Sequence, residues 1–451
     1  MLLGKSRIVD SLTKAARASR ADNTLLAAQR GSRTTLRFAG KRIHQNFHEE
    51  EVTVWVKVAC SGRIGISTTC SLGHDSVMRA IDSAMTIARV GAQKSAAAFL
   101  TTPPEKPTLP MTTYFSSTAE KPLTEIVREI RNLWTESGKM GVNLAGSFAR
   151  GEDELAVIGS QGLTQYQPFS VAGLRLVATD GKASGFGSHV VREIDSLHPE
   201  IVAQRALDFC RRNKDPKPIP LGQYDVLLEP EAVAELLEWL SYIGFGAKQT
   251  MERTSFMAGR IGEKLMDPRI SITDDGVDPL GLSVPFDYEG IPKQKVSLIE
   301  NGIARGIVYD SQYASLYEQH STGHAMPYDE FEGPVATHLF MAPGETPYRE
   351  MLKKMDNGLW ICRFHYISGL LKTQEALMTG LTRDGTFLIR NGKVAGAVKN
   401  LRFTQSILEA FSRIVAISQE RTLVADPSQG LSSAVVPALL IKNFTFTGQT
   451  K

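Results

Sequence analysis

Hydrophobic residues recur at helical spacing in several stretches of the first half of the chain. In residues 74–90, Val77, Ile81 and Met85 fall on one face of a helix, with polar residues on the other faces. Related patterns predict helices over residues 8–18, 123–134 and 197–211. We therefore expect four helices of ordinary length in this half of the chain.

Shorter apolar or alternating segments between these helices predict β-strands. The predicted strands cover residues 24–29, 34–38, 52–58, 63–68, 142–149, 154–160 and 162–178. Gly31 predicts a turn between the first two strands, and Gly151 predicts a turn before residues 154–160. A proline-rich stretch, residues 101–111, predicts a linker or an extended surface loop.

The run of residues 213–220 contains three prolines and cannot continue the helix before it. We place a boundary there, between an N-terminal α/β domain of residues 1–213 and a C-terminal domain of residues 221–451. In the second domain, Asn301-Gly302 and Asn391-Gly392 each join two short apolar segments, a strong hairpin signal. Further strands are predicted over residues 434–441 and 444–447, and helices over residues 346–355 and 405–417. The predicted fold class is α+β, with a β-rich, barrel- or sandwich-like C-terminal domain on which helices pack.

The composition is that of an ordinary globular protein and excludes several classes of function. The formal net charge is +3 over 451 residues, without the clustered Lys and Arg expected for binding nucleic acid or an acidic membrane surface. No window approaches the roughly 20 apolar residues of a membrane span, and the N-terminus lacks the apolar run of a signal peptide. The four cysteines are widely spread, which is typical of reduced thiols. We therefore expect a cytoplasmic protein that binds neither nucleic acid nor membranes.

The strongest candidate for chemistry joins a short apolar strand, residues 224–228, to a helix that begins near Pro230. Glu231 lies in the first turn, where the helix dipole favours a negative charge, and Glu235 follows four residues later on the same face. In zinc metallopeptidases such a helix carries two His ligands on one face, with a catalytic Glu beside the first. Here Pro230 and Glu235 stand at the ligand positions. The stretch therefore predicts a metallopeptidase frame without its metal-binding residues.

Two HxxxH pairs are weaker candidates for metal binding. His44 and His48 lie in a polar segment without helical apolar periodicity, which favours a solvated connection between strands over a metal pair. His320 and His324 enclose a glycine, so the i, i+4 geometry of a helix is not assured for them. The second pair remains an alternative metal site.

An acidic loop, residues 274–278, places three aspartates around Gly276. Oxygen ligands of this kind suit calcium, but the loop lacks the alternating oxygens and the closing Glu of an EF-hand. We therefore predict a solvated turn.

A possible binding pair lies in residues 362–366, where strand alternation puts Arg363 and His365 on one face. The same alternation puts Cys362, Phe364 and Tyr366 on the opposite face. Arg363 and His365 could bind a carboxylate or a carbonyl in a cavity, although a surface Arg and a hydrogen-bonded His would explain the pattern more simply. Arg383, in a Gly-bounded loop, could face the same pocket.

Several segments, taken in order along essentially the whole chain, resemble the TldD/PmbA (TldE) family. Members of this family are described as modulators of DNA gyrase and as peptidase-like proteins. The resemblance is carried by residues 227–235, Ser-Phe-Met-Ala-Gly-Arg-Ile-Gly-Glu at 255–263, Leu-Ile-Arg-Asn-Gly-Lys-Val at 388–394, and residues 427–448. The missing HExxxH motif makes the chain similar to the PmbA/TldE-like branch.

The resemblance implies a β-rich C-terminal domain unlike that of a thermolysin-type protease, and a paired subunit. TldD-type subunits carry zinc on an HExxxH helix plus a distant Cys, and TldE-type subunits pair with them without that metal. In this chain Pro230 and Glu235 would replace the two His ligands, Glu231 would be the one retained residue, and the Cys would be replaced around Ala425. The resemblance thus implies no cofactor in this chain and zinc in its TldD-type partner.

The expected function is that of a non-catalytic, TldE-like subunit of a heterodimeric zinc metallopeptidase that degrades or processes unfolded peptides. Arg363, His365 and Arg383 are its candidate substrate contacts. One alternative is a self-sufficient hydrolase with a rearranged metal site that uses His320, His324 or His365 in place of the missing ligands. Another is a binding or scaffold protein that pairs with itself as a homodimer.

Overall fold

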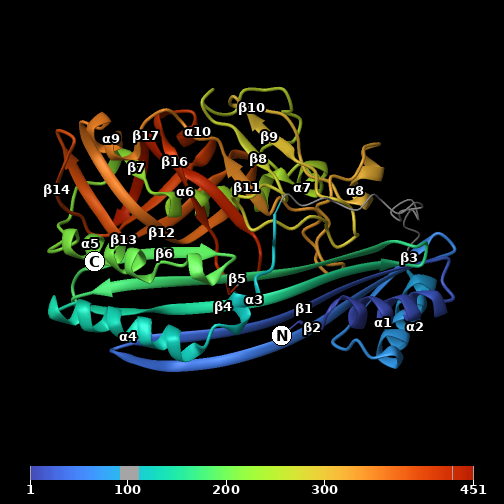
Figure 1. Cartoon of the computed structure of the whole chain (residues 1–451). Helices are drawn as coiled ribbons and strands as arrows, with labels where there is room; N and C mark the ends of the chain where they lie inside the picture. The colour runs from blue at the N-terminus through green and yellow to red at the C-terminus, as the bar shows by residue number, and fades with distance from the viewer. Residues whose placement is uncertain (1, 92–110, 429, 450–451) are drawn as a thin grey trace.

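Two β-sheets, lying in separate layers, organise the chain (Figure 1). The structure is a computed structural model that describes residues 2–91, 111–428 and 430–449. The predicted proline-rich linker falls almost wholly outside the described residues. The α+β class predicted from the sequence is confirmed. The division into domains of residues 1–213 and 221–451 stays a prediction.

The first sheet has six antiparallel strands in the order β3-β2-β1-β4-β5-β6. They are β1 (Asn23–Ala39), β2 (Arg42–Cys60), β3 (Arg63–Thr69), β4 (Asn143–Gly159), β5 (Thr164–Thr179) and β6 (Ser184–Val191). The helices of this half are α1 (Lys5–Ala18), α2 (His74–Val90), α3 (Ser116–Glu120), α4 (Leu123–Lys139) and α5 (Pro199–Arg212). Figure 1 shows α1 and α2 at one end of the sheet and α4 at the other, whereas α5 lies between the two layers. The four helices predicted from hydrophobic periodicity are all present, each with a buried apolar face.

Strands β1 and β4 are longer than the sequence pattern predicted. The turns predicted at Gly31 and Gly151 are both wrong, because each glycine lies mid-strand in the ladder between β1 and β4. The polar residues around them find partners across the sheet. Arg30 Nη1, for example, lies 3.2 Å from Glu152 Oε1, and both side chains are buried. Polar residues can therefore occupy the middle of a strand when neighbouring strands supply the opposite charge.

His44 and His48 lie within β2, not in a connection between strands. A strand rises about 3.3 Å per residue, so the two residues are roughly 13 Å apart along it. Both side chains are exposed, and His48 Nδ1 lies 3.0 Å from Thr34 Oγ1 of the neighbouring strand. One metal ion could not be bound by both imidazoles in this arrangement.

The second sheet has eleven strands, and part of it closes on itself. Strand β7 pairs with both β12 and β17, so β7, β12, β13, β15 and β17 form a closed ring. Strands β8 to β11 extend this sheet to one side of the ring, β14 pairs with β13, and β16 pairs with β17. The bounds are β7 (Gly222–Leu228), β8 (Ile272–Asp274), β9 (Val296–Glu300), β10 (Ile303–Ala304), β11 (His338–Met341), β12 (Asn357–Lys372), β13 (Leu377–Arg390), β14 (Lys393–Ala397), β15 (Leu401–Ser406), β16 (Ile414–Val424) and β17 (Ser433–Gln449). The barrel-like alternative of the sequence prediction is the one observed.

Both Asn-Gly hairpins are confirmed. Asn301-Gly302 joins β9 to β10 and Asn391-Gly392 joins β13 to β14, and all four residues have positive φ, as this turn requires. The helix predicted over residues 346–355 is present as α9 (Tyr348–Met351) and the 3-10 turn Leu352–Lys354 that follows it. The helix predicted over residues 405–417 is too long, because residues 405–406 belong to β15 and residues 414–417 to β16. The helices present are α6 (Pro230–Leu240), α7 (Ala247–Met251), α8 (Ser311–Leu316), α9 (Tyr348–Met351) and α10 (Ile407–Phe411).

Helix α6 is the central helix of the second half and packs against β12 and β17. Its apolar residues Ala232, Val233, Leu236, Leu237 and Leu240 are fully buried. Burial of this kind contributes about 1.5–3 kcal/mol per large side chain and holds the helix start firmly in place. Within the described ranges, no helix combines the length and apolarity needed to cross a bilayer.

Candidate functional site

The candidate site begins where β7 passes into α6. The Glu229 N–H donates to the Ile361 carbonyl of β12, and Pro230 then occupies the first helical position, as predicted. The side chains of Glu229 and Glu231 are almost completely buried, at 0% and 4% exposure for the two residues. Two adjacent buried carboxylates are costly unless cations or hydrogen-bond donors accompany them.

The cation is Arg205, which comes from α5 in the first half of the chain. Its Nη2 lies 2.9 Å from Glu229 Oε2 and 2.7 Å from Glu231 Oε2. The indole N–H of Trp360 donates to Glu229 Oε1 at 2.6 Å, and the hydroxyl of Tyr348 donates to the same oxygen. Both carboxylates are therefore held by partners that lie far from them in sequence.

Burial and charge oppose each other at this pair. Burial raises the pKa of Glu231, with Glu229 adding to the rise and Arg205 acting against it. Burial acts to lower the pKa of Arg205, but Glu231 and Glu229 raise it overall. The guanidinium accordingly stays charged at every pH that the protein tolerates.

Two glycines of β6 allow α5 to approach closely enough for this contact. A Cβ atom at Gly185 would lie 2.2 Å from the Ala206 carbonyl oxygen, and one at Gly187 would lie 2.3 Å from the Val202 carbonyl oxygen. Any larger residue would push α5 away from the sheet. The position of Arg205 therefore depends on these glycines.

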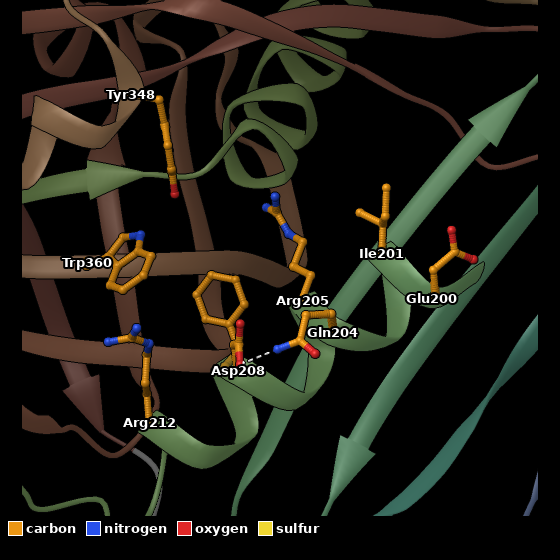
Figure 2. Close-up of a pocket in the computed structure, with 9 residues that line it drawn as sticks. Glu200, Ile201, Gln204, Arg205, Asp208, Arg212, Tyr348 and Trp360 are labelled. Carbon is orange, nitrogen blue, oxygen red and sulfur yellow. Dashed lines mark hydrogen bonds between the residues drawn. The ribbon is translucent and has the colours of Figure 1, made fainter. Parts of the chain in front are cut away.

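A cleft of about 670 Å³ opens beside Arg205, between α5 and the second half of the chain (Figure 2). Its lining residues are Glu200, Ile201, Gln204, Arg205, Asp208, Phe209, Arg212, Tyr348 and Trp360. Figure 2 shows Tyr348 and Trp360 facing Arg205 across the cleft. The ring centroids of Phe209 and Trp360 are 5.2 Å apart, so the aromatic wall is continuous. A cleft with aromatic walls and a paired Arg at its base can bind a peptide side chain, but it presents no metal ligand set.

Glu235 lies one turn beyond Glu231 on α6, at the position of the second His ligand. Its Oε2 atom is buried and has no hydrogen-bond partner within the described residues. Burial raises the pKa of Glu235 to about 8, against an opposing effect of Arg363. At neutral pH this residue is therefore mainly a protonated carboxylic acid, which is a poor metal ligand.

Arg363 is a less available binding residue than the sequence predicted. Its Nε donates to Asp384 Oδ2 at 2.8 Å, and its guanidinium carbon lies 4.4 Å from the centre of the Phe186 ring. Asp384 also accepts from Ser184 Oγ of β6 at 2.7 Å. Arg363 thus joins the two sheets, and much of its hydrogen-bonding capacity is already used.

The structure does bring the three predicted contact residues onto neighbouring strands. Arg363 lies opposite Arg383 in the β12–β13 ladder, and His365 lies two residues along β12. Arg383 is exposed, and burial lowers the pKa of His365, with Arg383 and Arg363 adding to the effect. The prediction that Tyr366 shares a face with Cys362 and Phe364 is wrong. Tyr366 is 78% exposed because its φ of 52° and an irregular register break the alternation after His365.

The alternative histidine pair is divided between two environments. His320 is exposed, whereas His324 is buried and its Nε2 lies 2.8 Å from Asp274 Oδ1. Asp274 also accepts the backbone N–H of His338 at 2.8 Å, so the solvated turn predicted at residues 274–278 is wrong at its start. Within the described ranges, no set of three His, Cys, Asp or Glu side chains is grouped closely enough to hold a metal ion.

The residues at the start of α6 do not fit zinc. Pro230 has no ligand atom, Glu235 is mainly protonated, and the carboxylates of Glu229 and Glu231 already share the guanidinium of Arg205. Ala425, where the resemblance implied a Cys, has only a methyl side chain. A catalytic zinc site needs about three protein ligands and an open position, which this donor set does not supply.

Sequence reasoning did not find Arg205, Tyr348 or Trp360. Arg205 lies within an amphipathic helix that precedes the proline-rich run, with no motif around it. The one available signal was indirect, since two acids at the start of a buried helix require a cation from elsewhere. Only the packing of α5 identifies which cation it is.

Comparison with known proteins agrees with this architecture. Residues 221–448 match the family model described as PmbA/TldA metallopeptidase C-terminal domain, and residues 26–88 match PmbA/TldA metallopeptidase domain 1. An uncharacterized protein of Methanocaldococcus jannaschii is 27% identical over 51% of this chain, and the match spans 54% of that relative's length. A metalloprotease TldD homolog of Buchnera aphidicola is 25% identical over 72% of this chain and 69% of its own.

Two solved structures share the fold over nearly the whole chain. TldE from Thermococcus kodakarensis superposes with a TM-score of 0.84 at 20% identity, covering 98% of this chain and 99% of that one. A protein from Thermotoga maritima, described as a candidate modulator of a DNA gyrase, superposes with a TM-score of 0.83 at 20% identity, covering 94% and 96%. At this level of identity the likeness establishes the fold alone.

Proposed function

The chain belongs to the PmbA/TldD family of metallopeptidase-related proteins, and on this premise we propose that it is the TldE-like, non-catalytic subunit of a heterodimeric zinc peptidase. The partner would be a TldD-like subunit that carries the zinc, and the pair would act on unfolded peptides in the cytoplasm. This chain would hold no metal of its own.

One observation carries the proposal: the guanidinium of Arg205 binds both acids at the start of α6, within 2.7 Å of Glu231. Glu231 is the residue that the family resemblance aligned with the catalytic Glu. A carboxylate that already accepts from a guanidinium is a weak general base, because proton uptake would weaken that charge-assisted bond. The role left to this subunit is to bind and orient the peptide substrate. The cleft beside Arg205, together with His365 and Arg383, offers surfaces for that peptide.

The alternative of a self-sufficient hydrolase gains no support from the geometry. His324 is committed to Asp274 in the core, and His320 lies apart from it at the surface. A homodimeric scaffold remains an outcome of the experiment below.

The test is to purify the full chain alone and together with the TldD-like subunit of the same host, and to measure zinc and peptide hydrolysis. We expect the lone chain to hold no zinc and to be inactive, and the pair to hold about one zinc per heterodimer and to cleave unfolded peptides. Glu231→Gln in this chain should leave hydrolysis by the pair within about twofold of the original rate. Stoichiometric zinc in the lone chain, or activity that Glu231→Gln abolishes, would overturn the proposal. A stable homodimer that never pairs with a zinc-bearing subunit would favour the scaffold instead.

A further inference from the structure

A second cavity, of about 270 Å³, lies between the two sheets and away from the residues that line the cleft of Figure 2. Residues of β1, β4 and β5 form one wall, and loops of the second half together with His338 of β11 form the other. Leu155, Phe169 and Phe286 belong to one apolar cluster that lines it, while the exposed Glu330 lies at its mouth. The volume is just below the roughly 300 Å³ at which pockets for drug-sized molecules begin, so it suits a smaller ligand.

The side chain of Lys293 enters this cavity past two glycines that pack closely against it and restrict its conformation. A Cβ atom at Gly276 would lie 2.3 Å from Cδ of Lys293, and a Cβ atom at Gly323 would lie 2.8 Å from its Cα. The absence of side chains at both positions therefore makes room for this lysine. Such close packing fixes the direction of a side chain that is otherwise flexible.

The terminal nitrogen of Lys293 has two neutral hydrogen-bond partners. It lies 3.0 Å from Thr337 Oγ1 and 3.4 Å from His338 Nδ1. His338 Nε2 lies 2.9 Å from the Leu282 carbonyl oxygen, so Nε2 carries the proton and Nδ1 is an acceptor, which the lysine shares with the Thr337 hydroxyl at 3.0 Å. Burial, and then Lys293, lower the pKa of His338 to about 3, so the ring is neutral. An ammonium has three N–H donors, and at least one is left over.

Lys293 also lacks a direct counter-ion. Among the described residues, no carboxylate oxygen lies within 4.0 Å of its Nζ. Asp274 is committed to His324 and to a backbone N–H. A cation that faces a cavity without a paired acid is an attractive site for the carboxylate of a ligand.

Asp287 is an acidic residue that lines the same cavity. Its Oδ1 accepts the backbone N–H groups of Glu289 and Ile291, but its Oδ2 accepts only that of Ala325, at 2.9 Å. One acceptor position on Oδ2 is therefore open, whereas the other buried acid of the cavity, Asp153, is paired with Arg33 at 3.1 Å. Lys293 and Asp287 thus face one cavity without touching each other.

We propose that this cavity binds a free apolar amino acid in its zwitterionic form, with the carboxylate on Lys293, the ammonium on Asp287 and the side chain against Leu155, Phe169 and Phe286. The separated charges are complementary to a zwitterion, and the apolar wall accounts for the side chain. Burial lowers the pKa of Lys293, although Asp274 and Asp287 act against it. Burial, with Glu289 adding to it, raises the pKa of Asp287 to about 7, so each residue would gain from an oppositely charged ligand group. The site does not depend on the function proposed above.

The test uses calorimetry on the full chain with three probes of equal shape: L-leucine, L-leucinamide without the carboxylate, and 4-methylpentanoate without the ammonium. We expect leucine to bind, and each of the other two to bind at least about tenfold more weakly, because each loses a charge-assisted contact. Lys293→Met should weaken leucine binding at least about tenfold, whereas Lys295→Met should not, because Lys295 is exposed and lies 3.5 Å from Asp275. No binding of leucine up to about 20 mM, or equal binding of any two probes, would overturn the proposal.

A second measurement needs no variant and covers the case in which Lys293→Met does not fold. Lysines of the original chain are acetylated with and without saturating leucine, and the rates are read by peptide mass spectrometry. Leucine should slow acetylation of Lys293 and leave that of Lys295 unchanged. Equal rates at Lys293 with and without leucine would contradict the assignment.

Discussion

Arg205 Nη2 lies 2.7 Å from Glu231 Oε2. The two residues are on different helices, α5 in the first half of the chain and α6 in the second, and the run of residues 213–220 separates them in sequence. The contact neutralises a buried acid at the start of α6 and attaches α5 to the second half of the chain. Where the resemblance implies a metal site in TldD-type subunits, this chain has an internal ion pair. The contact should therefore contribute to the stability of the folded protein, which denaturation experiments can measure.

Replacement of Arg205 by Met should lower the free energy of unfolding by about 3–5 kcal/mol, because Glu229 and Glu231 would keep their burial and lose their cation. Urea denaturation at pH 7 measures the difference. The matched control is Arg211→Met on the same helix, whose ion pair with Asp208 is about half exposed and should contribute less than about 1 kcal/mol. Equal effects of the two substitutions would show that the buried ion pair stabilises the protein no more than the exposed one does.

Gly187→Ala should destabilise the protein by about 1–3 kcal/mol, since the new Cβ would lie 2.3 Å from the Val202 carbonyl oxygen of α5. The helix has to move, and Arg205 moves with it. Thermal denaturation gives the magnitude. Gly396→Ala is the control, because a Cβ there meets nothing within 4 Å and should change stability by less than about 0.5 kcal/mol.

Glu235 should make the protein less stable as the pH rises. Burial raises its pKa from 4.5 to about 8 in the folded state, so between these values the folded chain holds a proton that the unfolded chain has released. The free energy of unfolding therefore falls with increasing pH across this window and levels off above pH 8. Glu235→Gln removes the effect and should be more stable than the original chain by on the order of 2 kcal/mol at pH 9. Parallel stability curves for the two proteins between pH 5 and pH 9 would refute this reading of the site.

Asp274 should have the opposite effect, making the protein less stable as the pH falls into the acidic range. Burial alone would raise its pKa, but His324 and Lys293 lower it overall, well below its ordinary value of 3.8. The stabilisation is therefore complete above about pH 4 and is lost as the pH falls through the folded-state pKa. Asp274→Asn should lower the free energy of unfolding by about 2 kcal/mol at pH 7 and by progressively less in acid. A deficit that is constant from pH 7 to pH 2 would show that the loss comes from packing alone.

Local patterns predicted the elements whose physical cause is local. The spacing of Val77, Ile81 and Met85 identified α2, and the Asn-Gly pairs identified both hairpins, because a turn that needs positive φ is encoded in two adjacent residues. Pro230 likewise marked the start of α6. The same reasoning failed at Gly31 and Gly151, where the glycines suggested turns but distant strands supplied partners for the polar residues around them.

The residues alone determined that Glu231 begins a helix without metal ligands, since Pro230 and Glu235 cannot act as imidazoles. Only the tertiary structure decided what neutralises that glutamate and which charges face the inner cavity. Arg205, Lys293 and Asp287 carry no motif, and their roles come from partners 24 residues or more away or from walls built by the other sheet. Electrostatic compensation of a buried charge depends on distance in space, whereas a helix start depends on neighbours in sequence.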